Sequence, residues 1–237
     1  MNQPDLRGKK FVASYSGGKD SVLAIYRSIK SGLLPLGMIT TYNIDAGRSW
    51  FHGVSENLIR LASDSLSMPV AIVKTTNKQY EENFEKALDE AKNKGAEVCV
   101  FGDIDIEGHF EWCSQRCKNV GLLPFFPLWN EERKKLVYEF IKNGFSTIII
   151  VVNTDLLPKN FLGQILTCEV ADSIEKCGAD VCGENGEYHT FTFDGPLFSN
   201  SVNFIVKDCV DQDKYAILNI EAGSGASNSS QANMETV

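Results

Sequence analysis

The chain has 237 residues, of which 43% are hydrophobic and 23% charged, so it can bury a core and has the composition of a folded globular protein. Its 23 Lys and Arg against 31 Asp and Glu give a net charge of -8, which argues against a surface that binds duplex nucleic acid. No run approaches the roughly 20 apolar residues of a membrane helix, and the start has no signal-peptide core, so we expect a cytoplasmic protein with no membrane partner. The 7 cysteines are odd in number, which favours reduced thiols over a disulfide framework.

Strands and helices alternate along the first half of the chain. Apolar runs predict strands over 10–14, 36–42, 70–73 and 98–101, and apolar residues at helical spacing predict the helices between and after them. These helices end at Gly32, Pro69 and Gly95, and a fourth covers 106–120. Apolar strands separated by helices predict crossover units on a parallel sheet.

The pattern changes after Pro124 and Pro127. A helix is expected from about Asn130, followed by strands over 147–152, 190–193, 202–206 and 215–220, and then by a polar stretch rich in Gly and Ser. We therefore predict an α/β domain over 1–125, a smaller mixed α+β domain over 126–222 and a flexible tail over 223–237.

One loop between the first strand and the first helix combines features that bind phosphate. Its residues are Ser14, Ser16, Gly17, Gly18, Lys19, Asp20 and Ser21. The two glycines allow a tight turn with outward N–H groups, and the helix N-terminus behind them favours an anion. The lysine adds a positive charge, which we expect to point at phosphate without supporting the core, and the aspartate can cap the helix or hold magnesium through water. The loop of kinases and GTPases has Lys directly before Ser or Thr, and here an aspartate separates them, so a different phosphate chemistry is expected.

The sequence Ser-Gly-Gly-Lys-Asp-Ser after a first strand resembles the pyrophosphate (PP) loop of the N-type ATP pyrophosphatases. The resemblance implies a Rossmann-like parallel sheet of the adenine nucleotide alpha hydrolase-like (HUP) class, with ATP and Mg²⁺ as cofactors. It also implies that the loop grips the β and γ phosphates as leaving pyrophosphate. The α-phosphorus would then be open to attack by a substrate oxygen, which gives an adenylated intermediate.

A second signal is the segment Cys182–Phe198, in which glycines flank two acids before a strand. Together with Phe51–Val54, Gly102–Ile104 and Pro127–Trp129, it resembles the signature of the diphthine-ammonia ligase family over about residues 10–220. The resemblance implies ATP-dependent amidation: a carboxylate on a modified histidine of a translation elongation factor is adenylated, and ammonia then displaces AMP. Members of the family that act on that factor more often carry an acidic residue at the position of His189. The presence of a histidine there resembles the bacterial relatives. The acceptor carboxylate is therefore left open between such a factor and a small molecule.

Site residues are expected in both halves, the first as pyrophosphatase domain and the second as substrate-binding domain. The expected catalytic residues are Lys19, Asp20, Glu184 and Glu187; the nucleotide contacts are the PP-loop residues with Thr41, His52, Gly102 and Asp103; the magnesium ligands are Asp20 and Asp103; and the acceptor contacts are Asn185, Glu187 and His189. An acid directly after a strand lies at the edge where parallel sheets bind ligands. A carboxylate in a partly dry cleft can deprotonate ammonium.

Several assignments stay open. Adenine is expected against 39–42 by the family resemblance, and Arg48 either closes over the phosphates or is solvated. His109 faces either solvent or substrate, and Trp129 is either functional or a domain-interface anchor. A PP-loop tRNA-modifying enzyme is a second reading, although the chain has no Cys-x-x-Cys pair. A third interpretation is a non-catalytic adenine-nucleotide sensor, which pyrophosphate release would exclude. Whether the protein forms a homodimer is left open.

Overall fold

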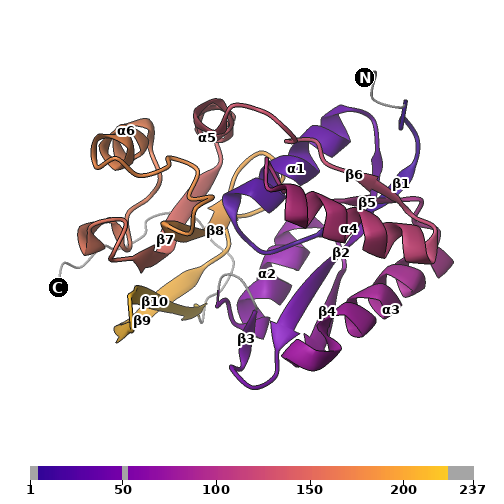
Figure 1. Ribbon diagram of the computed structural model, residues 1–237, viewed down its shortest axis with the longest axis horizontal. Helices are drawn as coiled ribbons and strands as arrows, with labels where there is room; N and C mark the ends of the chain where they lie inside the picture. The colour runs from indigo at the N-terminus through magenta and orange to yellow at the C-terminus, as the bar shows by residue number, and fades with distance from the viewer. Residues whose placement is uncertain (1–4, 50–52, 224–237) are drawn as a thin grey trace.

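The computed structural model describes residues 5–49 and 53–223, which form two β-sheets with helices around them (Figure 1). The first sheet contains β1 (Lys10–Ser14), β2 (Leu34–Asn43), β3 (Arg48–Ser49), β4 (Val70–Thr75), β5 (Val98–Val100) and β6 (Leu123–Phe125). The second contains β7 (Ser146–Asn153), β8 (Tyr188–Asp194), β9 (Phe204–Gln212) and β10 (Tyr215–Ala222). His52 and residues 224–237, to which we assigned a phosphate contact and a tail, lie outside the described residues.

The first sheet is parallel in the order β4-β2-β1-β5-β6, and the short β3 pairs antiparallel with the end of β2. The chain runs outward from β1 through β2 to β4 and then returns to β5 on the other side of β1. This reversal makes a topological switch point between β1 and β5. Ligands of open parallel sheets bind beyond the carboxyl ends of the strands at such a point.

Helices cover both faces of this sheet. Since neighbouring residues of a strand point to opposite faces, neighbouring residues of β1 pack against different pairs of helices. Phe11 and Ala13 of β1 pack in the same cluster as α1 (Lys19–Lys30) and α2 (Glu56–Leu66). Val12 packs in the other cluster with α3 (Tyr80–Asn93) and α4 (Glu107–Val120). The 3-10 turn η1 (Asn77–Gln79) leads into α3. None of the helices within 5–49 and 53–223 is long and apolar enough to cross a membrane.

The second sheet is antiparallel in the order β8-β7-β10-β9 and carries α5 (Arg133–Lys142) and α6 (Cys168–Lys176), with the turn η2 (Lys159–Phe161) between β7 and α6. Its core is continuous with that of the first sheet, since α1, α2, α5 and β7 contribute to one buried cluster. The loop between β1 and α1 also contacts β8 directly: the Thr192 N–H donates to the Gly17 carbonyl at 2.8 Å. The two halves therefore share both apolar packing and backbone hydrogen bonds.

The predicted fold class, a parallel α/β sheet with a smaller mixed C-terminal part, is confirmed. Three elements were missed. β6 contains Pro124, which as an edge-strand residue need not donate to a ladder. α6 begins after Thr167, whose side chain caps the helix, and β3 has only two residues. The strand predicted over 202–206 was also misplaced, because β9 runs from Phe204 to Gln212. The domain boundary near 125 stays a prediction.

Because one cluster joins both halves, a core truncation in α5 should destabilise the whole molecule. Phe140 is 1% exposed and stacks on Phe145 with ring centroids 4.9 Å apart. We expect Phe140→Ala to lower the free energy of unfolding by about 3–5 kcal/mol in a single urea transition. Leu156→Ala is the matched control, since Leu156 is 44% exposed and should cost under about 0.5 kcal/mol. Two separate transitions, or an equal effect of the two changes, would contradict a shared core.

Candidate active site

The PP-loop turns between β1 and α1 because Gly17 adopts a positive φ of 86°. Gly18 is the N-cap of α1 and provides no side-chain hydrogen bond to the first turn. The hydroxyls stay inside the turn: the Ser21 Oγ donates to the Gly18 carbonyl at 2.9 Å, and the Ser16 Oγ accepts from the Gly18 N–H at 3.3 Å. The N–H of Lys19 in the first turn donates to the Thr190 hydroxyl at 3.1 Å. The N-cap glycine leaves the rest of the start of this 12-residue helix without a side-chain cap, which is a favourable place for an anion.

Gly102, two residues beyond the end of β5, packs against the start of α1. A Cβ at this position would lie 2.8 Å from the Ser21 backbone nitrogen and 2.9 Å from the Asp20 carbonyl carbon. Any side chain would therefore push the β5–α4 loop away from the PP-loop. The glycine brings the two loops of the switch point into contact, as expected from its position at the sheet edge.

Lys19 supports the packing of the molecule, contrary to our expectation that its side chain would not. Its side chain is buried, and its ammonium donates to the Asp20 carboxylate at 2.7 Å and to the carbonyl of Cys182. The ammonium also lies 5.5 Å from the centre of the Tyr188 ring. Burial alone would lower the pKa of Lys19, yet the neighbouring Asp20 carboxylate keeps the pKa well above its ordinary value. Lys19 therefore supports the packing between α1 and the segment around Cys182, while remaining part of the cavity wall.

The acidic segment 180–187 is a compact loop closed by two of its own carboxylates. Glu187 is 3% exposed and accepts from the Asp180 N–H, from the Asn185 N–H and from the Asn185 side-chain amide at 3.0–3.1 Å. Asp180 accepts from the N–H groups of Cys182 and Glu184 at 3.1 and 3.0 Å. Glu187 and Asn185 thus shape the loop from inside, whereas Glu184 and His189 lie on the wall of the adjacent cavity.

A cavity of about 690 Å³ lies between these loops and helices α3 and α4. Its polar end is lined by Ser14, Ser16, Lys19, Asp20, Ser21, Gly102, Asp103, Glu184, His189 and Thr190. Its other end is aromatic: Tyr80, Phe84 and Trp112 contact one another with ring centroids 5.5–6.4 Å apart. The volume is that of a small-molecule or cofactor site. The aromatic end was missed in the sequence, although Tyr80, Phe84 and Trp112 are all visible there as aromatic residues on predicted helices.

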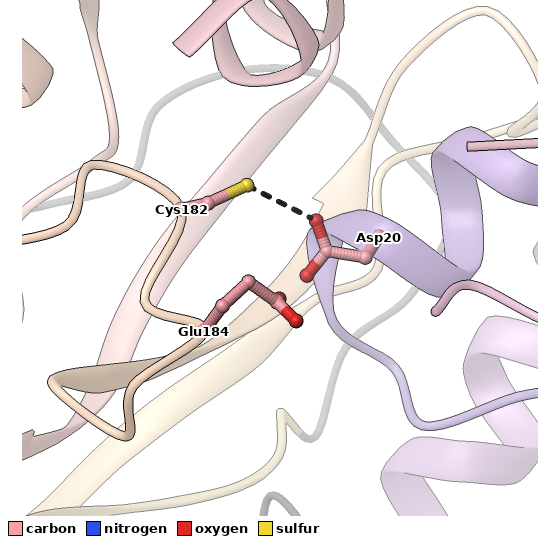
Figure 2. Close-up of side chains that lie close together, drawn as sticks. All are labelled: Asp20, Cys182 and Glu184. Atoms are coloured by element: carbon pink, nitrogen blue, oxygen red, sulfur yellow. Dashed lines mark hydrogen bonds between the residues drawn. The ribbon is translucent and has the colours of Figure 1, made fainter. Parts of the chain in front are cut away.

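Three potential ligand groups converge at the polar end, as Figure 2 shows: Asp20, Cys182 and Glu184 place one ligand atom each within 4.8 Å of one another. The thiol of Cys182 lies 3.9 Å from the Asp20 carboxylate (Figure 2). Burial, and next the charge of Asp20, raise the pKa of Glu184 to about 7. Burial also raises the pKa of the Cys182 thiol, so this sulfur stays protonated at neutral pH.

The two histidines within the described chain both line this cavity, in opposite electrostatic settings. Asp103, a predicted nucleotide and magnesium contact, holds the His109 Nδ1 at 3.1 Å and raises the pKa of that imidazole. His189 is largely buried, and burial followed by the charge of Lys19 lowers its pKa to about 4. At neutral pH, His189 is therefore uncharged and His109 is biased towards its cation.

The remaining predicted residues are not part of the cavity wall. Thr41 is buried with its hydroxyl 3.3 Å from that of Tyr80, and residues 39–42 are not part of the cavity wall. The guanidinium of Arg48 donates to Asn219 of β10 rather than facing the PP-loop. Trp129 packs on Phe110 with ring centroids 4.6 Å apart, which agrees with an anchoring role.

Comparison with known proteins gives matches in both halves. Residues 9–124 match the diphthamide synthase N-terminal domain, and residues 132–224 match the diphthamide synthase C-terminal domain. The chain belongs to the diphthamide synthase family. The family resemblance deduced from the two motifs is thereby confirmed.

The curated relatives are named diphthine–ammonia ligase. The mouse protein is 38% identical over 90 residues, which cover 36% of this chain and 34% of the relative. The Schizosaccharomyces pombe protein is 32% identical over 99 residues, which cover 40% of this chain and 16% of the relative. The match thus spans about a third or less of these proteins. A solved structure, described as a predicted subunit of tRNA methyltransferase from Methanocaldococcus jannaschii, covers 77% of this chain and 96% of its own at 15% identity and a TM-score of 0.43, values that support no functional argument.

The pKa of Glu184 predicts a pH-dependent stability. Its pKa is about 7 in the folded protein against an ordinary 4.5, so the folded state binds more protons between these values. The free energy of unfolding should therefore fall as the pH rises from 4.5 to 7, by about 2–3 kcal/mol for this group. Urea unfolding of Glu184→Gln at pH 5 and pH 8 should lack this loss. Glu107→Gln, at an exposed position of α4, is the control and should lose stability with pH as the wild type does. The same pH dependence in Glu184→Gln as in the wild type would refute the raised pKa of Glu184.

Proposed function

We propose that this protein is an ATP pyrophosphatase and amide ligase of the diphthine-ammonia ligase type. A substrate carboxylate would attack the α-phosphorus of ATP and release pyrophosphate. Ammonia would then attack the acyl carbon of the adenylate, which releases AMP and the amide. The observation that carries this proposal is the cavity in which the PP-loop and the Cys182–His189 segment form one polar wall opposite aromatic side chains.

The two ends of the cavity match the two ends of ATP. The aromatic cluster of Tyr80, Phe84 and Trp112 offers faces for a purine, and stacking of a base on an aromatic side chain contributes about 1–3 kcal/mol. At the other end, the start of α1 favours the phosphates, and the side chains of Ser16 and Ser21 line the wall beside it. We therefore place adenine against α3 and α4, rather than against residues 39–42, and the phosphates at the PP-loop.

Lys19 contributes a fixed positive charge to this wall. Its ammonium is held by Asp20 and by the carbonyl of Cys182, so it remains charged while nucleotide binds. A charge that is already oriented before the reaction stabilises a departing pyrophosphate without reorganisation of the site. The side chain would thus act electrostatically from the cavity wall.

Asp20 fits the magnesium ion that the family resemblance implies. Its carboxylate oxygens are hard ligands and face the polar end of the cavity, whereas the neighbouring Cys182 carries a proton and is too soft for this ion. Asp103 is the second expected ligand and also lines the cavity. One oxygen of each carboxylate is already paired, that of Asp103 with His109 and that of Asp20 with Lys19, so each would offer its other oxygen to the ion. When bound there, magnesium would neutralise negative charge on the phosphates.

Glu184 is the best candidate for proton transfer. A carboxylate with a pKa of about 7 can accept a proton from ammonium and pass it on at neutral pH. His189 is a weaker base because burial keeps its pKa near 4, and Glu187 has its oxygens occupied within the loop. We therefore assign the acid–base role, which we first divided between two glutamates, to Glu184 and assign the loop geometry to Glu187.

The direct test incubates the protein with MgATP, nitrogen-15 ammonium and an elongation factor that carries diphthine, with a set of small carboxylic acids as parallel acceptors. We expect AMP and pyrophosphate in equal amounts, together with incorporation of the label into one acceptor as an amide. Formation of ADP and phosphate would contradict the proposal. If the protein binds the nucleotide but releases no pyrophosphate with any of the acceptors, the result would favour a non-catalytic adenine-nucleotide sensor.

A single substitution separates nucleotide binding from the acid–base step. Glu184→Gln should lower the rate of amide formation by about 100-fold, because the amide side chain cannot accept the proton. Its affinity for α,β-methylene-ATP, measured by calorimetry, should stay within about threefold of the wild type, since the charge of Asp20 remains. Glu107→Gln serves as the acidic control outside the cavity wall. An unchanged rate in Glu184→Gln would remove Glu184 from the reaction.

A further inference from the structure

Arg133, the first residue of α5, connects two loops that carry opposite walls of the cavity, the β5–α4 loop and the acidic loop 180–187. Its Nε and Nη2 donate to the two oxygens of Asp105, both at 2.7 Å. Its Nη1 donates to Asp180 at 2.7 Å and to the side-chain oxygen of Asn185 at 3.3 Å. One guanidinium thus joins the β5–α4 loop to the acidic loop 180–187, and it lies outside the cavity wall itself.

Each partner of Arg133 is close in sequence to residues of that wall. Asp105 follows Gly102 and Asp103, which line the cavity in the first half. Asp180 accepts from the N–H groups of Cys182 and Glu184, which line it in the second half. The position of the Glu184 backbone therefore depends on Asp180, and the position of Asp180 relative to the first half depends on Arg133.

We propose that Arg133 is a positioning residue that holds the Cys182–Glu184 wall at a fixed separation from the Gly102–Asp103 wall, and so sets where Glu184 meets the bound nucleotide. This inference rests on the proposed function for its catalytic consequence. The planar guanidinium makes the fork with Asp105 and reaches Asp180 at the same time. A lysine ammonium keeps the charge but cannot reproduce this three-bond geometry.

Loss of the clamp should affect turnover more than nucleotide binding. A displacement of about 1 Å in a reacting group can cost about 100-fold in rate, whereas the PP-loop and the aromatic wall do not contact Arg133. For Arg133→Ala we expect kcat for AMP formation to fall about 10–100-fold and the KM for MgATP to stay within about threefold. Arg133→Lys should be intermediate, and added guanidinium chloride at millimolar concentration should restore part of the lost rate in Arg133→Ala only.

A second arginine provides a matched control. Arg27 makes the same kind of two-bond contact with Glu139, at 2.9 and 2.5 Å, and also donates to the Pro127 carbonyl at 2.8 Å. It joins α1 to α5 away from the cavity wall. Arg27→Ala should lower the melting temperature about as much as Arg133→Ala does and leave kcat unchanged. An equal loss of kcat in both variants, without rescue by guanidinium, would reduce Arg133 to a structural ion pair and overturn the inference.

Amide hydrogen exchange tests the clamp without any reaction. The N–H groups of Cys182 and Glu184 donate to Asp180, so they should exchange at least about tenfold faster in Arg133→Ala and at the wild-type rate in Arg27→Ala. If the wild type forms no AMP, the proposed function fails while this measurement still decides whether Arg133 fixes the loop. Unchanged exchange in Arg133→Ala would overturn the inference even in an active ligase.

Discussion

The site depends on one buried charge. The ammonium of Lys19 sits out of water, so it needs partners, and it has them in Asp20 of its own helix and in the carbonyl of Cys182 from the other half of the chain. The same turn is held again by the N–H of Thr192, which donates to Gly17. These contacts fix the PP-loop against the acidic loop, so the parallel sheet alone provides only half of the site.

The electrostatics of the cavity follow from this arrangement. Asp20 and Glu184 lie close together in a partly dry corner, and their repulsion, added to burial, gives Glu184 a pKa of about 7. His189 is kept neutral by burial, while His109 is biased towards its cation by Asp103. One cavity thus contains groups that hold, donate and accept protons at neutral pH, which is the pattern expected where acid–base chemistry accompanies phosphate departure.

Local sequence features predicted the parts of the site that are formed by neighbouring residues. The PP-loop was found because its glycines, serines and lysine follow one another between a strand and a helix. Gly102–Asp103 was found because the segment follows the strand predicted over 98–101. The roles of Glu184 and Glu187 could not be separated in this way. They are three residues apart, and the turns at Gly183 and Gly186, with φ of 77° and 85°, direct one carboxylate to the cavity and leave the other inside the loop. The burial of Lys19 and the aromatic wall depend on contacts between segments far apart in the chain, for which the sequence has no local signal.

If ATP binds as proposed, its phosphates lie at the PP-loop, and we expect the α-phosphorus to face Glu184. A crystal structure of the protein with magnesium and α,β-methylene-ATP tests it most directly. We expect the β and γ phosphates against Ser16–Ser21, adenine between Tyr80 and Trp112, and the α-phosphate towards the Cys182–Glu184 wall. A nucleotide bound outside this cavity, or one with its γ-phosphate directed at Glu184, would contradict it.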